Sequence, residues 1–369
     1  MYKKFDFYEL KSIIELNSYT KNKEGVDKNG DIFTTWMENL GFERISYNRE
    51  KIGNHLHFIS KKQKGKKVLL LGHLDTVFPP NSFENFKEDE EWIYGPGVCD
   101  MKGGNYIALM ALRQIKEKYK EIKNIDMLLV SDEETGSDDS KFVTMELAKD
   151  YDYCLVYEAA GENGEVVIGR KGVGTFFIEI IGKAAHAGNN YIHGINANLE
   201  AAHKLIDLTA LTNLEKETTV NVGKIDGGIG ANTISPTAQL VVEIRYTDIK
   251  ERDRVLKQMQ EIVDNSVVKG VETLFLGGIQ RDVMQPINEQ AHFLEQIENI
   301  CGEKLLTEKR GGVSDANIIS NAGVITLDGF GPFGDGDHTV NERASKKSFI
   351  DRIDLSEKIL SALMENRFN

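Results

Sequence analysis

The sequence predicts an α/β protein whose central sheet is interrupted by a smaller, inserted α+β domain. The first half of the 369-residue chain alternates short β-branched runs with amphipathic helical stretches, a pattern typical of α/β layers. Between about residues 174 and 277 the order of expected elements changes, and afterwards α/β character returns. A chain of this length favours two domains. We therefore expect residues 1–173 and 278–369 to form a discontinuous domain into which 174–277 is inserted.

Several runs predict the elements of the discontinuous domain. Val68–Leu71 reads as a buried strand, and Asn105–Ile122 places apolar residues at helical spacing. Met127–Val130 and Tyr153–Val156 read as the next strands, and Val324–Leu327 as a later one. Strands that alternate with helices predict α/β layers built around a central sheet.

The inserted segment has a different order of elements. It predicts, in sequence, strand Thr175–Ile181, helix Asn198–Leu211, strands Thr218–Ile225 and Ala238–Tyr246, helix Glu251–Val268 and strand Val271–Leu276. This β-α-β-β-α-β order is typical of a ferredoxin-like sandwich.

Composition excludes several classes of function. Hydrophobic residues make up 40% of the chain and charged residues 28%, the balance of a folded globular protein. No segment approaches the roughly 20 apolar residues that cross a bilayer. The net charge of −13 would repel nucleic acid and anionic membranes. We therefore expect neither nucleic acid nor a membrane as a partner.

The amino terminus and the cysteines indicate a cytoplasmic location. Charged residues interrupt the apolar stretches of residues 1–10, so the uncharged core of a secretory signal is missing there. Cys99, Cys154 and Cys301 are odd in number and widely spaced, which fits reduced thiols better than a disulfide framework.

Side chains that bind metals follow three of the expected strands. His73 comes just after the first strand and Glu158 just after the third. Glu133 and Glu134 follow the strand between them in sequence. Because ligand sites in open α/β sheets lie at the carboxyl ends of the strands, we expect these side chains to lie close together.

Two glycine-rich loops offer further metal ligands. The turn at residues 94–104 presents Asp100 just before the expected helix, and a loop after residues 324–327 carries His338. Two histidines and three carboxylates can hold two metal ions if one carboxylate bridges them, and mixed ligation of this kind suits zinc. Two such ions can generate hydroxide from water and polarise a carbonyl, and one remaining carboxylate would then act as a base.

In this order the residues resemble a known family, the co-catalytic zinc exopeptidases, which include glutamate carboxypeptidase, acetylornithine deacetylase, succinyl-diaminopimelate desuccinylase and aminoacylase. The shared pattern is His-x-Asp at His73, Gly-x-x-Asp-Met-Lys-Gly-Gly around Asp100, Glu-Glu at Glu133, a later acidic residue and a near-terminal histidine. The resemblance covers almost the whole chain and leans toward glutamate carboxypeptidase-like members. It implies a mixed-sheet zinc-exopeptidase catalytic domain with an inserted ferredoxin-like dimerisation domain that acts as a lid.

The resemblance also implies the metal ligands. Asp100 resembles the bridging ligand, Glu134 and His338 would complete one zinc site, and His73 and Glu158 would complete the other. Cobalt or manganese could take the place of zinc. Taken singly, such a carboxylate is more often a loop or capping residue, but the ordered combination favours a metal centre.

Catalytic roles follow from the same resemblance. Glu133 would be the general base, and Asp75 would hold the His73 ring in its ligating tautomer. His186, in Gly-Lys-Ala-Ala-His-Ala-Gly, would reach across a homodimer and stabilise the oxyanion in the partner's site. Considered alone, a histidine in such a turn is more often a surface or capping residue.

Substrate recognition is expected at four positions. By the resemblance, Asn232 and Arg281 would bind a free carboxylate of the substrate, with Arg245 a weaker candidate, since arginine suits a two-pronged grip on a carboxylate. Gly312, in a glycine-rich run, would offer a backbone donor.

These residues together predict a two-zinc, carboxypeptidase-like exopeptidase that hydrolyses the amide bond of a small peptide or N-acyl amino acid with a free carboxylate. An N-acyl amino acid deacylase of the aminoacylase or deacetylase type is the alternative within the family. A non-catalytic metal or amino-acid binding protein ranks lower, because the presumed base Glu133 is intact alongside every ligand. His55 and His57, which alternate along an expected strand, are interpreted as solvent-facing residues.

Overall fold

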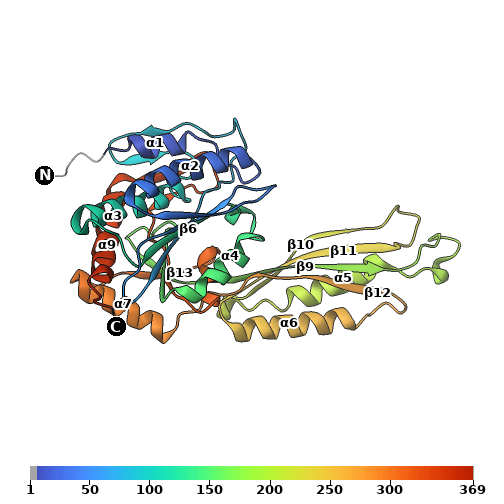
Figure 1. The fold of residues 1–369 in the computed structure, drawn as a ribbon. Coiled ribbons are helices and arrows are strands. Elements are labelled where there is room, and N and C mark those ends of the chain that lie inside the picture. The colour runs from blue at the N-terminus through green and yellow to red at the C-terminus, as the bar shows by residue number, and fades with distance from the viewer. Residues whose placement is uncertain (1–5, 369) are drawn as a thin grey trace. The chain divides into compact units, whose positions relative to one another are not determined.

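The computed structural model describes residues 6–368 and divides into two compact units (Figure 1). The first unit holds the described residues up to Gly169, Pro286–Lys309 and the described residues from Ser314. The second unit holds Arg170–Gln285 together with Arg310–Val313. The predicted domain boundaries lie near these divisions and stay a prediction. Residues 1–5, part of the stretch inspected for a secretory signal, lie outside the described residues.

The first unit is built on a mixed six-stranded sheet, which confirms the predicted α/β class. In spatial order its strands are β1 (Glu43–Tyr47), β2 (His55–Ile59), β6 (Ile125–Val130), β3 (Val68–His73), β7 (Tyr153–Val156) and β14 (Ile325–Leu327). The four neighbouring strands β6, β3, β7 and β14 run parallel to one another. Strand β2 runs antiparallel to both of its neighbours, β6 and β1. Every residue of β3 and β6 is buried, as expected of parallel strands covered on both faces.

Helices of the first unit pack around this sheet (Figure 1). They are α1 (Tyr8–Ile14), α2 (Lys23–Leu40), α3 (Lys102–Tyr119), α4 (Ser140–Leu147), α7 (Asn288–Cys301), α8 (Asp315–Asn321) and α9 (Lys346–Met364), with short 3-10 turns η1 (Glu133–Thr135) and η2 (Ala148–Asp150). Helix α3 packs against both β3 and α9, so its first turn lies close to the sheet.

Two smaller sheets accompany the central sheet. One contains β15 (Gly334–Asp335), β16 (Arg343–Ser345), β5 (Trp92–Tyr94) and β4 (Lys87–Glu88). The other pairs β13 (Thr307–Arg310) with β8 (Val166–Arg170). The first of these sheets joins the segments that carry the two glycine-rich loops.

The second unit is a four-stranded antiparallel sheet with two helices, and it has the predicted β-α-β-β-α-β order. Its elements are β9 (Gly172–Ile181), η3 (Tyr191–His193), α5 (Ala197–Thr209), η4 (Leu214–Lys216), β10 (Thr219–Gly227), β11 (Thr237–Tyr246), α6 (Ile249–Asp264) and β12 (Glu272–Arg281), with the spatial strand order β10-β11-β9-β12. Alternate residues of β9 and β11 form one core with α5 and α6. Asn196 and Asp248 cap the two helices through their side chains.

Some predicted boundaries were wrong. Helix α6 ends at Asp264 because Asn265 adopts an extended conformation. Strand β12 continues past the predicted end at Leu276 to Arg281, since Gly277, Gly278 and the residues after them still pair with β9. A side chain at Gly277 would lie 2.2 Å from the Thr175 carbonyl oxygen, and the φ of Gly277 is +99°, so this strand position requires glycine.

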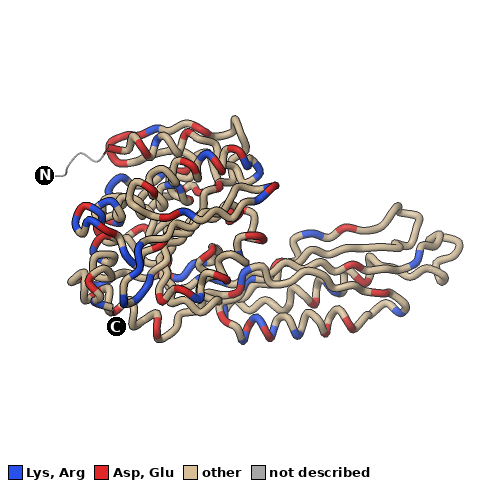
Figure 2. The backbone as a smooth tube through the Cα atoms, in the orientation of Figure 1, with Lys and Arg blue, Asp and Glu red and all other residues tan. Residues whose placement is uncertain are grey.

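Three features of the described residues concern helix hydropathy, the distribution of charge and the cysteines. No helix among residues 6–368 is both long and apolar enough to span a membrane. Acidic and basic residues are interspersed over both units, without a continuous basic stripe (Figure 2). All three cysteines are free thiols. The predicted cytoplasmic location stays a prediction.

Candidate metal centre

Three strands of the central sheet deliver polar side chains to one edge. His73 is the last residue of β3, η1 with Glu133 and Glu134 follows β6, and Glu158 follows β7. Strands β6 and β7 flank β3 and run parallel to it, so their carboxyl ends meet at the same edge. His73, Glu133 and Glu158 are all less than a tenth exposed.

The two glycine-rich loops add Asp100 and His338 to this edge. Asp100 precedes Met101, the residue that caps α3, and the peptide bond between them is cis. His338 lies between β15 and β16, where φ values of +76° at Gly336 and +61° at His338 turn the loop sharply.

Asp100 lies between the two histidines. Its Oδ1 is 3.0 Å from His73 Nε2 and its Oδ2 is 3.2 Å from His338 Nε2. A further carboxylate accompanies each histidine: Glu158 Oε1 lies 3.8 Å from His73 Nε2, and Glu134 Oε2 lies 3.2 Å from His338 Nε2. The five side chains therefore form two groups that share Asp100.

Burial and mutual repulsion shape the charges of this cluster. Burial, reinforced by the charge of Asp100, raises the pKa of Glu134 and of Glu158 well above the ordinary value. Although burial opposes it, hydrogen bonds from His338 and His73 hold the pKa of Asp100 below its usual range. Hydrogen bonds to Asp100 and Glu134 raise the pKa of His338 to about 11. Without metal ions, protons on the imidazole rings compensate the negative charge of the carboxylates.

This donor set fits metal ions. One ligand atom from each of His73, Asp100 and Glu134 lies within 4.8 Å of the others. Imidazole nitrogens and carboxylate oxygens are ligands that zinc accepts, and a divalent cation would compensate buried carboxylates that otherwise depend on protons. The arrangement of two groups around one carboxylate fits two ions better than one.

Asp75 supports His73 chiefly through its backbone. His73 Nδ1 is 3.0 Å from the Asp75 carbonyl oxygen and 3.4 Å from the carboxylate Oδ1. The other carboxylate oxygen accepts hydrogen bonds from the Thr20 hydroxyl at 2.7 Å and the Glu134 N–H at 3.3 Å. Thr20 therefore links the segment before α2 to the cluster. The sequence alone did not predict a role for this residue. When the Asp75 carbonyl oxygen accepts a hydrogen bond from Nδ1–H of His73, the other ring nitrogen, Nε2, is left to face Asp100.

Glu133 is the first residue of η1, adjacent to Glu134. Its negative charge contributes to raising the pKa of Glu134 and of Glu158. It is thus electrostatically coupled to both groups of the cluster, at a position consistent with a base beside the ligands.

In the second unit, His186 is exposed and has a defined tautomer. Its Nδ1 accepts hydrogen bonds from the N–H groups of Gly188 at 3.1 Å and Asn189 at 3.2 Å. An unprotonated Nδ1 places the proton of the neutral ring on Nε2, which makes Nε2 a donor. Asn232 lies beside it, because Thr233 pairs with His186 and the Asn232 carbonyl accepts from Ala187.

The other predicted substrate residues gather at the opposite end of the same sheet. Arg245 on β11 and Arg281 on β12 both pair with Val173 of β9. Arg245 also forms a double ion pair with Glu243 and donates to the Gly311 carbonyl at 2.9 Å. Gly312 accepts a hydrogen bond from Arg170 at 3.1 Å, so its carbonyl faces the protein.

The structure therefore separates the predicted substrate residues into two groups. His186 and Asn232 lie beyond Ile181, at the far end of β9 from Val173. Eight residues of extended strand span about 27 Å. Within one second unit, Asn232 and Arg281 are therefore too far apart to bind the same carboxylate.

Comparisons with known proteins decide the family. The model described as Peptidase family M20/M25/M40 matches residues 69–362. The chain belongs to this family. Carboxypeptidase G2 of Pseudomonas sp. (strain RS-16) is 30% identical to this M20 chain over an alignment of 261 residues. The alignment covers 68% of this chain and 62% of that protein, less than two thirds of its length. Succinyl-diaminopimelate desuccinylase of Rickettsia bellii (strain RML369-C) is 27% identical over 364 residues and 90% of each chain.

Solved structures share the fold of this M20 chain. Aminopeptidase PepT from Bacillus cereus ATCC 10987 superposes with a TM-score of 0.80 over 96% of this chain and 97% of that one, at 22% identity. This likeness confirms the α/β fold with a mixed central sheet and separate antiparallel sheets.

The interpretation of His55 and His57 as solvent-facing was wrong. Both lie on β2 and are buried, because β2 pairs with β6 inside the sheet. His55 Nε2 is 3.0 Å from Asp139, and His57 Nε2 is 2.7 Å from the Tyr151 hydroxyl. They are core histidines of the M20 fold and lie apart from the cluster, and the buried Nδ1 of His57 has no hydrogen-bond partner among the described residues.

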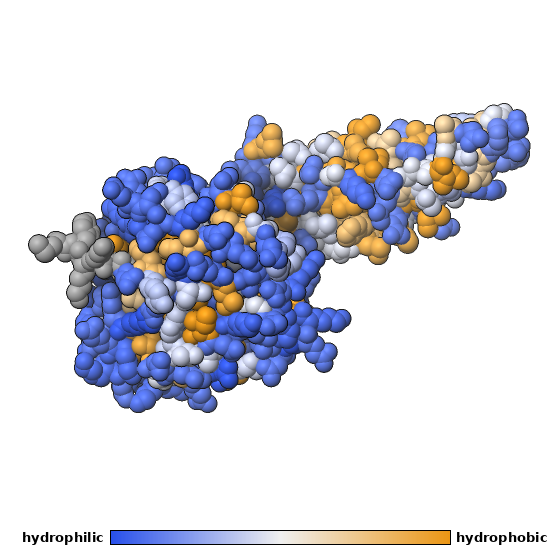
Figure 3. Space-filling view, turned by 90° about the horizontal axis from the view of Figure 1, so that it is seen from above, coloured by the Kyte–Doolittle hydropathy of each residue, from blue (hydrophilic) through white to orange (hydrophobic). Residues whose placement is uncertain are grey.

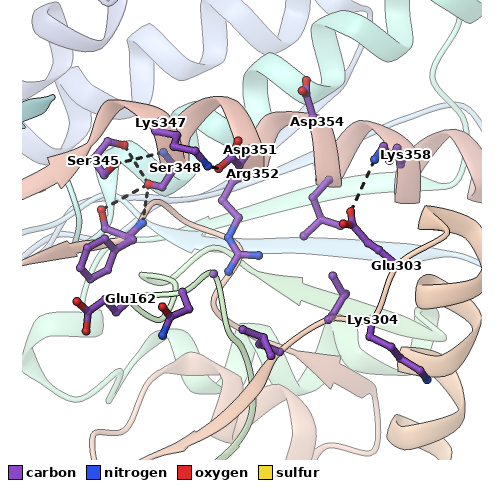
Figure 4. A pocket seen from close by; sticks show the side chains of 16 residues that line it. Glu162, Glu303, Lys304, Ser345, Lys347, Ser348, Asp351, Arg352, Asp354 and Lys358 are labelled. Carbon is purple, nitrogen blue, oxygen red and sulfur yellow. Dashed lines mark hydrogen bonds and ion pairs between the residues drawn. The ribbon is translucent and has the colours of Figure 1, made fainter. Parts of the chain in front are cut away.

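A cavity of about 700 Å³ in the first unit does not contain the metal cluster (Figure 4). No predicted site residue of this M20 chain lines it. Several of its charged lining residues are engaged: Lys347 pairs with Asp351, Lys358 lies 3.9 Å from Glu303, and Arg352 donates to the Glu165 carbonyl. This cavity therefore adds no group to the candidate chemistry.

Proposed function

We propose that this M20 protein is a two-zinc metallo-exopeptidase of the carboxypeptidase type, which hydrolyses the amide bond of a small peptide or N-acyl amino acid with a free carboxylate. The observation that carries the proposal is the position of Asp100 between two histidines, each accompanied by a further glutamate. The 30% identity to carboxypeptidase G2 supports the choice of a carboxypeptidase.

Five side chains would hold the two ions. Asp100 would be shared, His73 and Glu158 would complete one site, and Glu134 and His338 the other. When bound, a pair of zinc, cobalt or manganese ions activates water and polarises a carbonyl.

Glu133 would move the proton in the reaction. Its carboxylate takes a proton from the attacking water while the new C–O bond forms, and returns it to the amine nitrogen as the C–N bond breaks. The small exposed fraction of Glu133, 8%, supports this role, because a carboxylate shielded from bulk water holds the proton between the two steps.

His186 would stabilise the negative charge that develops on the carbonyl oxygen. Its tautomer supports the assignment, since two backbone N–H groups donate to Nδ1 and the proton of the neutral ring is then on Nε2, where it can be donated.

A homodimer would reconcile the two groups of substrate residues. Arg281, with Arg245 and the Gly312 segment, would bind the substrate carboxylate in one subunit, while Asn232 and His186 would come from the other. The separation of about 27 Å along β9 supports this division, because one chain cannot supply both groups to a small substrate.

An apolar face of the second unit supports a protein partner. Phe177, Ile181, Leu274 and Leu276 are each exposed by 39% to 50%, and the register of β9 with β12 puts them on the face opposite α5 and α6. Hydrophobic residues gather over this unit in Figure 3. Exposed apolar patches of this kind are typical of protein interfaces.

A deacylase is the second candidate. The 27% identity to succinyl-diaminopimelate desuccinylase over 90% of both chains favours it, and the same cluster can attack an N-acyl amide. The two candidates differ in which side of the amide carries the larger group.

Turnover of a mixed substrate panel tests these assignments. Zinc-loaded protein would be incubated with N-acyl amino acids, dipeptides ending in different amino acids, and tripeptides, with chelated protein as the control. Release of the C-terminal amino acid from peptides, abolished by chelation, is expected. Exclusive cleavage of acetyl or succinyl amides would assign a deacylase, and release of the N-terminal residue of tripeptides would contradict the carboxypeptidase assignment.

A further inference from the structure

Glu342 is a buried carboxylate that the proposed chemistry does not use. Its side chain is 1% exposed. Oε2 accepts a hydrogen bond from the N–H of Gly97 at 3.0 Å, and Oε1 accepts from the N–H groups of Cys99 at 2.9 Å and Asp100 at 3.1 Å. The backbone carbonyl of Glu342 accepts a fourth, from Gly95 at 3.3 Å. One residue therefore holds four N–H groups of the loop that carries Asp100.

The same residue is tied to the loop that carries His338. The Glu342 N–H donates to the Thr339 carbonyl at 3.2 Å, and Thr339 in turn donates to the Gly336 carbonyl through its N–H and its hydroxyl. These bonds close the turn around His338. Glu342 then passes directly into β16, which pairs with β5 just before the Asp100 loop.

The two side-chain oxygens of Glu342 and the length of its side chain both matter here. A carboxylate presents only acceptors, so both of its oxygens can receive the converging N–H groups. An amide of the same size has one acceptor oxygen, and its NH₂ group would oppose an N–H donor in a buried site. A buried N–H that loses its acceptor is costly, and the loop would move to find another.

We propose that Glu342 is a positioning residue for the metal centre, which fixes Asp100 relative to His338 without touching either metal or substrate. This inference rests on the proposed function. Asp100 Oδ2 and His338 Nε2 lie 3.2 Å apart and belong to two different loops. Hydrogen bonds of Glu342 connect these two loops. Because a bridging ligand must face both ions, a small rotation of Asp100 weakens both sites at once.

The test is metal binding and spectroscopy of the full chain carrying Glu342→Gln. Chelated protein is titrated with Co²⁺ alone, and affinity, stoichiometry and the visible absorption of the bound ion are recorded, followed by kcat and KM. The variant is expected to bind Co²⁺ about 10- to 100-fold more weakly, with an altered absorption spectrum and a lower kcat. Glu342→Asp keeps the charge on a shorter side chain, and it serves the same test if the glutamine variant does not fold.

Glu251→Gln is the matched control. Glu251 is 2% exposed and is held by Arg254 and Lys216 in the second unit, so the same substitution removes a buried structural carboxylate elsewhere. It is expected to lower stability while leaving Co²⁺ affinity and spectrum unchanged.

The outcomes separate this inference from the proposed function. Weak Co²⁺ binding by Glu342→Gln, with unchanged binding by Glu251→Gln, supports the positioning role. Wild-type affinity and spectrum in the folded Glu342 variants would overturn it. Absence of tight binding in the wild-type chain would instead refute the two-metal centre itself.

Discussion

Asp100 has its place in the cluster because neighbouring residues hold it from two sides. Its backbone N–H is bonded to Glu342, and its two carboxylate oxygens face His73 and His338. The pattern around Asp100 in the sequence predicted a bridging ligand, but the bond to Glu342 joins residues 242 positions apart. No local pattern reveals a contact of that range.

Glu133→Gln tests the role of the base at this scale. The amide has nearly the same shape but accepts no proton, so turnover should fall at least about 100-fold. Metal content and the unfolding transition should stay close to wild type, because Glu133 is not among the proposed ligands. Steady-state kinetics with metal analysis check both points, and a variant with wild-type turnover would remove Glu133 from the mechanism.

Helix α3 packs closely against the central sheet at Gly104. A side chain at Gly104 would lie 1.9 Å from the carbonyl oxygen of Tyr157, the residue before Glu158. This close approach places the start of α3, and thus Asp100, beside the end of β7.

Gly104→Ala should therefore destabilise the protein, although alanine favours helix. Overpacking typically costs about 1 to 3 kcal/mol, and the shift should also weaken metal binding through Glu158. Gly278→Ala is the control, because no atom lies within 4 Å of its added Cβ, and it should change stability by less than about 1 kcal/mol. Urea unfolding of both variants measures the difference; equal stability would show that the helix is free to move away.

His57 gives strand β2 a pH-dependent contribution to stability. Burial lowers the pKa of His57 to about 4, against an ordinary value of 6.5. Between these pH values the unfolded chain binds a proton that the folded chain does not, so stability falls as pH decreases from 6.5 to 4. The full effect is about 3 kcal/mol.

His57→Gln should remove this part of the pH dependence. The glutamine does not titrate, so the variant should lose less unfolding free energy between pH 7 and pH 4 than wild type. Denaturant unfolding at several pH values makes the comparison. Parallel profiles for the two proteins would mean that His57 titrates equally in both states.

Sequence periodicity predicted the elements well where they are long and regular. Strands β3, β6, β7 and β11 and helices α3 and α5 match the expected runs to within a few residues. Periodicity ended β12 too early, because the glycines that interrupt its apolar pattern still pair with β9. It also failed to predict that His55 and His57 are buried. In the site, the candidate ligands at strand ends could be predicted from the sequence. Thr20 and Glu342 could not, because each acts through a hydrogen bond to a residue distant in sequence.

At the scale of the whole molecule, the proposal requires two chains for one reaction. His186 and Glu133 would act on the same substrate from different subunits. Mixing two inactive variants tests this directly, because in a two-fold dimer each site takes one residue from each chain.

Equal amounts of Glu133→Gln and His186→Ala should regain activity after subunit exchange. Half of the dimers would be mixed, and one of their two sites would have both wild-type residues, so about a quarter of wild-type activity is expected. Each variant kept alone is the control. If the mixture stays as inactive as its components while mixed dimers are present, His186 does not act across the subunit interface.

The central claim is a hydrolytic centre of two metal ions that share Asp100. The most direct measurement is the release of a C-terminal amino acid as chelated protein is titrated with zinc. We expect chelated protein to be inactive and activity to rise until about two zinc ions are bound per chain. Turnover that persists without metal, or two tightly bound ions without hydrolysis of any peptide or N-acyl amino acid, would contradict it.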